Sequence, residues 1–492
     1  VSASQLEINS HIKFYSGIKT SDIQETLIKA AAELISEETP NYQIVAARLV
    51  NYHLRKQIYG TINPPSFRSH VNSVVALGFY DSQILDWYDD EEIEKLGEYI
   101  KHDRDYDLVY AGVEQFRGKY LVRNRVTKQI YETPQFAYML IAMTLFHAEK
   151  KDRLRWVKDY YDAISTFKIS LPTPIMSGVR TPQRQFSSCV LIEADDDLDS
   201  IASTGHAIMK YVANKAGIGI GAGKLRPLGA PIRNGDATHT GVIPFFKFWQ
   251  DAVKSCSQGG VRGGSATLYY PFFHLEVEDL LVLKNNKGTE FNRLRQLDYG
   301  VQFNRMAYER LVEGGNITLL NPHDVPGLYD AFFECPDHFK ELYEKAERNP
   351  KIRKKVIPAV QFFSAFMQER KDTGRIYLAN MDNINIQGSF IPGISTVRMS
   401  NLCVEITLPT SPVYNVFDAE ARSEIALCIL SALNVGILKP EEYERIAHLA
   451  VRALDNLIDL QAYMMPAAEW PARQRRTIGI GVVNFAYWMA KN

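Results

Sequence analysis

The chain has 492 residues, 46% of them hydrophobic and 23% charged, which is ordinary for a globular protein of two to four domains. Its 56 Lys and Arg residues nearly balance 57 Asp and Glu residues. The net charge of -1 therefore excludes a general attraction to nucleic acid or to an anionic membrane. No apolar run approaches the roughly 18 residues of a membrane-spanning helix, so we expect a cytoplasmic protein. Because the first residue is Val1 rather than Met, we expect that the natural chain begins earlier or has been processed.

Residues 20–59 show helical periodicity, beginning at Ser21 and Gln24, which resemble a capping box. The helical pattern continues through residues 60–185. The acidic run at residues 89–92 predicts an exposed helix start, because carboxylates there interact favourably with the helix dipole. The first 185 residues are thus expected to be helical.

After residue 185 the pattern changes to short β-branched runs that alternate with amphipathic helices. Strands are predicted at Cys189–Ile192 and Gly217–Ile220, and a helix at Pro440–Leu460, with one apolar face. Such alternation favours an α/β architecture with parallel strands.

The five cysteines lie far apart, at Cys189, Cys256, Cys335, Cys403 and Cys428. No C-x-x-C pair or neighbouring histidine pair accompanies them, which argues against a zinc site and against a secreted disulfide framework. In a reducing compartment a cysteine is usually a small buried hydrophobic residue, and each is first interpreted in that way.

Two glycine-rich segments suggest nucleotide binding. Ala216–Gly223 fails both the G-x-G-x-x-G and the Walker A patterns, which disfavours a conventional Rossmann or P-loop enzyme. Lys254–Gly264 combines four glycines with Gln258 and Arg262, whose side chains are suited to reading a base edge or a phosphate. A flexible surface loop is the equal alternative for this second segment.

The segment Asn401-Leu402-Cys403-Val404-Glu405 holds a donor, a thiol and a base at alternate positions. If it is extended, Asn401, Cys403 and Glu405 share one face. A chance edge strand explains such a pattern more often than a site does. His274-x-Glu276-x-Glu278 is interpreted as structural, because the C-x-x-C of zinc deaminases is absent, and the pair Tyr269-Tyr270 is interpreted as packing.

Together, six segments resemble the large subunit of class I ribonucleotide reductase, of the bacterial and T-even-phage type. They are S-L-P-T-P-I-M-S-G-V-R-T-P (Ser170–Pro182), R-Q-F-S-S-C-V (Arg184–Val190), K-S-C-S-Q-G-G-V-R-G-G (Lys254–Gly264), L-L-V-L-K-N-N (Leu280–Asn286), S-N-L-C-V-E-I (Ser400–Ile406) and E-I-A-L-C-I-L-S-A (Glu424–Ala432). The resemblance covers essentially the whole chain.

The resemblance implies radical-based reduction of ribonucleoside diphosphates to deoxyribonucleoside diphosphates. Cys403 matches the thiyl-radical cysteine that abstracts the 3′ hydrogen, and Glu405 matches the base on the 3′-hydroxyl. Asn401 would bond the substrate hydroxyl. Cys189 and Cys428 match the reductant pair that ends as a disulfide, and folding must bring them together.

Nucleotide contacts are implied by the same resemblance. The substrate diphosphate would be bound by Thr173, by Ser188 and by the backbone near Gly217. A nucleotide effector would select the base to be reduced from a specificity site formed by Asp196, Arg226, Ile232 and the loop from Gln258 to Arg262. No metal site is implied in this chain, and Cys335 matches nothing in the family's chemistry.

The implied fold is a truncated ATP-cone-like helical segment at 1–59, a helical N-terminal domain at 60–185 and an incomplete ten-stranded α/β barrel at 186–492. The first strands of the ATP-cone are not among these residues, and Gln24 replaces a cone histidine while His53 remains. Control of activity by ATP and dATP is therefore not implied by these residues.

The later barrel strands, the P-S-E-T-S substrate loop, a tyrosine pair for radical transfer and a C-terminal cysteine pair are also not among these residues. We therefore expect the chain to act only with a complementing C-terminal polypeptide and with a small subunit whose di-iron tyrosyl radical supplies the oxidation. Thioredoxin or glutaredoxin, dNTP and ATP effectors and a homodimer are further implied.

The sequence opposes two other functions. A catalytically silent nucleotide-binding regulator is opposed by the joint presence of Cys189, Cys403, Glu405 and Cys428. An ordinary α/β kinase or dehydrogenase is opposed by the failed glycine motifs.

Overall fold

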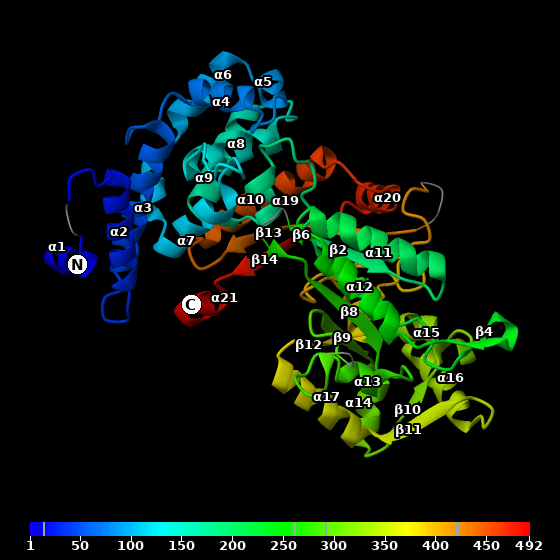
Figure 1. Cartoon of the computed structure of the whole chain (residues 1–492). Coiled ribbons are helices and arrows are strands. Elements are labelled where there is room, and N and C mark those ends of the chain that lie inside the picture. The colour runs from blue at the N-terminus through cyan, green and yellow to red at the C-terminus, as the bar shows by residue number, and fades with distance from the viewer. Residues whose placement is uncertain (13–14, 259–261, 291–292, 419–422) are drawn as a thin grey trace. The chain divides into compact units, whose positions relative to one another are not determined.

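A computed structural model describes residues 1–12, 15–258, 262–290, 293–418 and 423–492 (Figure 1). Its contacts divide the chain into two units. The first, here called the helical unit, comprises Val1–Phe186, Leu430–Ala462 and Ile478–Asn492. The second, the sheet unit, comprises Ser187–Ile429 and Tyr463–Thr477. No described helix is both long and apolar enough to cross a membrane.

Helices make up most of the helical unit. Its elements are α1 (Ala3–Ser10), α2 (Thr20–Glu33), α3 (Tyr42–Tyr59), α4 (Phe67–Ala76), α5 (Gln83–Trp87), α6 (Asp90–Tyr99), α7 (Tyr110–Gln115), the π-helix η2 (Phe116–Tyr120), α8 (Pro134–Phe146), α9 (Arg153–Ser165), β1 (Ile169–Ser170), α10 (Thr173–Gly178), α19 (Tyr443–Leu460), β14 (Ile478–Val483) and α21 (Phe485–Lys491). Every residue of α8 is buried, so this helix is the centre of the unit.

Of the two helix starts predicted from the sequence, one is wrong and one is confirmed. The capping box at Ser21 is wrong, because α2 starts one residue earlier and the Ser21 hydroxyl donates to Asp22 instead. The amide of Gln24 donates to the Leu49 carbonyl of α3, at 3.0 Å. The acidic run does start a helix, as predicted, since Asp89 caps α6 and accepts from the Glu92 N–H at 2.8 Å.

Five parallel strands form the centre of the sheet unit, in the order β2 (Cys189–Glu193), β3 (Gly217–Gly221), β8 (Ala266–Pro271), β9 (Asp298–Phe303) and β12 (Ile376–Asn380). The first residues of β13 (Ala426–Asn434) run antiparallel to β2. Helices α11 (Leu198–Ala213), α12 (Ile243–Ser255), α13 (Val277–Leu281), α14 (Arg305–Val312) and α17 (Ala359–Thr373) belong to this unit, and Figure 1 shows β8, β9 and β12 side by side. The predicted α/β architecture with parallel strands is confirmed.

The segment after β8 is a turn and not a strand, so His274 and Glu276 do not share a strand face. The His274 ring bonds the Leu225 carbonyl at 2.8 Å, and burial lowers its pKa to about 4. The Glu276 carboxylate accepts from the N–H groups of Leu228 and Val242. Both side chains thus stabilise neighbouring loops through hydrogen bonds to their backbone.

Candidate active site

Two of the predicted cysteines lie directly opposite each other on adjacent strands. Cys189 begins β2, Cys428 lies in β13, and the antiparallel register pairs their Cα atoms. Opposed residues in antiparallel strands have Cα atoms about 4.5–5.5 Å apart, within the range that a disulfide spans. Although 239 positions separate them in the sequence, the fold brings the two thiols together.

Burial makes both thiols poor acids. Burial, opposed in part by the Asn401 amide, raises the pKa of Cys189 to about 12, and the charge of Glu405 adds to the rise. Burial likewise raises the pKa of Cys428 well above its usual value. Both groups are therefore neutral thiols at physiological pH, able to give up a proton together with an electron.

The segment 401–405 is a tight turn, so the extended conformation considered for it from the sequence does not occur. The Asn401 N–H donates to the Ile406 carbonyl at 3.2 Å, and the Ile406 N–H donates back to the Asn401 side chain at 3.2 Å. Val404 has a positive φ of 70°, which β-branched residues seldom adopt. Cys403 is exposed at this turn.

Three of the predicted side chains nevertheless meet. The buried Asn401 amide donates to the Cys189 sulfur at 3.0 Å and to the Glu405 carboxylate at 2.8 Å. The Cys189 sulfur and the Glu405 carboxylate are 3.8 Å apart. One amide therefore fixes a thiol and a carboxylate at adjacent positions, an arrangement suited to moving protons at a bound hydroxyl.

The glycines of β3 explain how the turn approaches the sheet. A Cβ on Gly219 would lie 2.0 Å from the Ser400 carbonyl oxygen, and one on Gly217 would lie 2.7 Å from the Leu402 side chain. The intervening isoleucines are fully buried in the core. The alternate glycines thus provide a flat strand face for the turn rather than a phosphate loop.

Two anchors of this turn were missed from the sequence. The Tyr269 hydroxyl donates to the Asn401 carbonyl, and the Thr267 hydroxyl donates to the Leu402 carbonyl at 2.6 Å. Both come from β8, two positions apart and hence on one face. The interpretation of Tyr269 as a packing residue is incomplete, because its hydroxyl positions the backbone that precedes Cys403.

The residues predicted to bind the substrate belong to both units, Ser188 and Gly217 to the sheet unit and Thr173 to the helical unit. The Ser188 hydroxyl is 3.8 Å from the Cys189 sulfur, and the Ser188 carbonyl accepts from the Gly217 N–H at 2.9 Å. The Gly217 N–H therefore already donates a hydrogen bond within the protein. Thr173 is exposed at the first position of α10 in the helical unit.

The predicted effector residues form two groups in the sheet unit. Asp196 accepts from the Arg226 N–H at 3.0 Å and pairs with its guanidinium, which also donates to the Pro231 carbonyl beside Ile232 at 3.0 Å. His323, which the sequence did not reveal, lies 3.2 Å from the Asp196 carboxylate.

The second group is a hairpin of β6 (Ser257–Gln258) and β7 (Arg262–Gly263), in which Gln258 is paired with Arg262. Residues 259–261 of this predicted loop lie outside the described residues.

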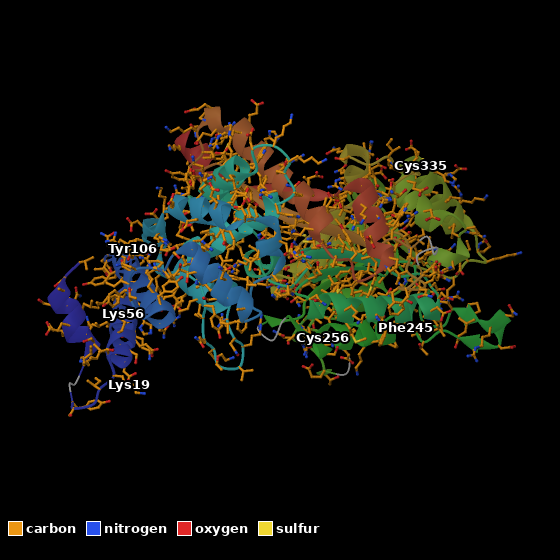
Figure 2. The ribbon with its side chains drawn as sticks, turned by 90° about the horizontal axis from the view of Figure 1, so that it is seen from above. Lys19, Lys56, Tyr106, Phe245, Cys256 and Cys335 are labelled. Atoms are coloured by element: carbon orange, nitrogen blue, oxygen red, sulfur yellow. The ribbon has the colours of Figure 1, made fainter. Side chains whose placement is uncertain are left out.

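The remaining cysteines lie on other elements. Cys256 follows the last residue of α12 and is half-buried, and Cys335 is exposed between α15 (Leu328–Glu334) and α16 (Pro336–Arg348). Figure 2 labels both and shows them on separate parts of the sheet unit. They serve as natural controls for the chemistry of the paired thiols.

The chain is similar in sequence to known proteins. A family model described as the ribonucleotide reductase barrel domain matches residues 187–492, and one described as the all-alpha domain of that enzyme matches residues 106–184. Ribonucleoside-diphosphate reductase 1 subunit alpha of Escherichia coli is 59% identical over 493 residues. The corresponding alpha subunits of Haemophilus influenzae and Enterobacteria phage T4 are 57% and 51% identical over 494 and 492 residues.

These alignments cover 100%, 100% and 99% of this chain but only 65%, 65% and 64% of the relatives. The chain thus spans just under two thirds of the length of the curated relatives it matches.

Proposed function

Because this chain belongs to the ribonucleotide reductase large-subunit family, we propose that it forms the major part of a catalytic subunit that reduces ribonucleoside diphosphates to deoxyribonucleoside diphosphates. The observation that carries the proposal is the direct pairing of Cys189 with Cys428, beside the amide of Asn401. A pair of reducing thiols must reach one sugar carbon together, and the register of Cys189 and Cys428 supports this assignment.

In the proposed reaction Cys403, oxidised to a thiyl radical, abstracts the 3′ hydrogen of the ribose. Glu405 takes the proton of the 3′-hydroxyl, and Asn401 bonds a substrate hydroxyl. Cys189 and Cys428 supply two electrons and two protons, so that the 2′-hydroxyl leaves as water and a disulfide remains. The substrate then carries hydrogen at the 2′ carbon. Cys403 gives its hydrogen back to the 3′ carbon and so regains its radical state, and Glu405 returns the proton to the 3′ oxygen.

The partners are part of the proposal. A separate small subunit with a di-iron tyrosyl radical would supply the oxidation, and thioredoxin or glutaredoxin would reduce the disulfide again. Thr173, Ser188 and the backbone near Gly217 would bind the substrate diphosphate. A dNTP or ATP effector would bind at Asp196, Arg226, Ile232, Gln258 and Arg262 at the contact of a homodimer, an isologous arrangement.

We further propose that polypeptide corresponding to the remaining third of the relatives contributes the rest of the barrel. Support comes from β14 and α21, whose apolar side chains are largely exposed in this structure: Val482, Phe485, Tyr487 and Met489 are 53–59% exposed. Exposed apolar surface of this extent marks an interaction face. The division into 1–59, 60–185 and 186–492 stands as part of this proposal.

A reductase assay tests the proposal. The chain, the small subunit, the complementing polypeptide and a dithiol are incubated with a ribonucleoside diphosphate. Cys403→Ala and Cys428→Ser are expected to abolish product, whereas Cys335→Ser retains it because Cys335 lies between α15 and α16, on neither the paired strands nor the turn. Product formation that survives Cys428→Ser would contradict the assigned reductant pair.

The same assay separates the second candidate function, a silent nucleotide-binding regulator. Such a protein would bind dNTP by calorimetry yet form no deoxynucleotide with any partner combination.

A further inference from the structure

A cavity of about 310 Å³ lies in the helical unit among η2, α10 and β1. This volume is at the lower end of the range of small-molecule sites, roughly 300–1,000 Å³. Its walls are mainly aromatic and aliphatic, and Phe116 meets the rings of Tyr120 and Tyr138 edge-on at centroid distances of 5.6 and 5.4 Å. The cavity thus has the volume and the apolar surface to hold an aromatic ring.

None of the lining residues carries a charge. They are Leu108, Gly112, Gln115, Phe116, Tyr120, Tyr138, Ile164, Phe167, Ile169, Ser170, Leu171, Met176, Asn434 and Val483. An anion placed here would lose its hydration without gaining a cationic partner. The cavity therefore excludes phosphate-bearing molecules and favours a neutral one.

Tyr138 supplies an unused polar group. The residue is only 6% exposed, and no hydrogen bond of its hydroxyl is found among the described residues. The hydroxyl oxygen is not among the fully buried atoms that lack a partner, so water reaches it, and a ligand that accepts from it would replace that water. Since Tyr138 lines the cavity, a ligand in the cavity is the natural source of such an acceptor.

We propose that this cavity is a binding site for a neutral aromatic small molecule whose hydrogen-bond acceptor meets the Tyr138 hydroxyl. The π-helical turn at Phe116–Tyr120 fits such a role, because π-turns are rare and are frequent at functional sites. This turn brings Phe116 and Tyr120 into the wall.

Arg180 links the site to α10. Its fully buried guanidinium donates to the Met176 carbonyl at 2.7 Å and to the Tyr120 carbonyl at 2.8 Å. One guanidinium therefore joins two lining segments of the cavity, and a ligand that moves these segments apart must strain both bonds. If the proposed function holds, occupancy also affects substrate binding, because α10 begins at Thr173.

Three probes of similar shape test the site on the whole chain. Quinoline is neutral and has a ring acceptor, naphthalene lacks the acceptor, and 1-naphthoate is charged. By calorimetry, quinoline is expected to bind at one site, with naphthalene about three- to tenfold weaker, the value of one hydrogen bond. Equal or tighter binding of 1-naphthoate would overturn the proposal, as would the absence of quinoline binding.

Variants assign the binding to this cavity. Tyr138→Phe keeps the shape and loses no protein hydrogen bond, so it is expected to fold and to bind quinoline and naphthalene equally. Gly112→Leu fills the cavity and is expected to weaken the binding of quinoline and of naphthalene at least about tenfold. The new Cβ would lie 3.4 Å from the Leu108 side chain, an ordinary contact distance. Unchanged quinoline binding in Gly112→Leu would overturn the assignment.

Trp87→Phe is the matched control, because Trp87 lines a separate cavity of this unit, of about 460 Å³. Quinoline binding is expected to be unchanged in this variant. Loss of quinoline binding in Trp87→Phe would show that the probe does not bind at Tyr138. None of these measurements depends on nucleotide reduction, so the site and the proposed function fail or succeed separately.

Discussion

At the residue scale, one amide controls the relation between a thiol and a carboxylate. Asn401→Asp keeps the oxygen that accepts from the Ile406 N–H but removes the donor to Cys189 and Glu405. It also adds a negative charge beside Glu405. We expect the turn to persist and the reductase activity of the complemented enzyme to fall about 10- to 100-fold, the value of a hydrogen bond to a charged group. Activity within twofold of the unchanged protein would refute the assigned role of Asn401.

The raised pKa of Cys189 predicts how its reactivity depends on pH. The thiolate is the reactive form, and a pKa of about 12 leaves little thiolate at neutral pH. Iodoacetamide is expected to label Cys189 about tenfold faster for each pH unit between 7 and 10, as the thiolate fraction grows. Peptide mapping of the folded chain measures this rate. A rate that levels off below pH 9 would mean that burial does not control this thiol.

Proximity of the two thiols predicts a specific disulfide. Mild oxidation of the folded chain with diamide is expected to join Cys189 to Cys428, because their Cα atoms are paired in register. Cys256 and Cys335 are expected to remain unjoined, being on separate parts of the sheet unit. Mass spectrometry of the digest identifies the linked peptides, and a mixture of random pairings would count against the register.

At the scale of elements, the strand β3 is shaped by the turn packed against it. Gly219→Ala would place a Cβ 2.0 Å from the Ser400 carbonyl oxygen, so the backbone must move. We expect a loss of about 1–3 kcal/mol in the free energy of unfolding, and faster proteolysis within residues 400–406. Gly118→Ala is the matched control, since nothing lies within 4 Å of its Cβ. Equal stability of the two variants would show that the turn does not rest on β3.

The sequence predicted this strand but misjudged its glycines. Runs of β-branched residues marked β2 and β3 correctly, because buried parallel strands are continuously apolar. Glycine at every second position, however, signals that another backbone approaches one face, and that partner is more than 180 residues away in the sequence. Local patterns do not identify such a partner.

The turn at residues 401–405 shows the same limit. Alternation suggested an extended strand, whereas the positive φ of Val404 and the bond from the Ile406 N–H to Asn401 close a turn. Tyr269 and Thr267 hold this turn through bonds to backbone carbonyls, which carry no sequence signal. Alternation first indicated Asn401, Cys403 and Glu405 as a possible site, and the resemblance to a family then assigned their roles. Their assigned roles stay predictions.

At the scale of the whole molecule, a buried ion pair holds the helical unit together. Arg180 and Glu132 are both fully buried, and Glu132 also accepts from the Tyr80 hydroxyl at 2.7 Å and from the Val122 N–H at 2.6 Å. Glu132→Gln leaves the guanidinium without a counter-charge, and we expect a loss of about 3–5 kcal/mol in the free energy of unfolding. Glu91→Gln, which breaks an exposed pair with Lys95, is expected to change little. Urea denaturation compares the two variants.

The exposed apolar face of β14 and α21 carries the last prediction. Phe485, Tyr487 and Met489 are 53–59% exposed, and the relatives contain a further third of sequence that this chain does not match. Polypeptide corresponding to that third is expected to bind this face, because covering apolar side chains and completing the strand edge of β14 both lower the free energy. Mixing the two should reduce the fluorescence of a bound hydrophobic dye and raise the unfolding temperature. Met489→Lys weakens this association, since a charge would then be buried, whereas Lys355→Glu, in the sheet unit, leaves it unchanged. Binding that tolerates Met489→Lys would place the partner elsewhere, and the barrel would then have to be completed by a different surface of this chain.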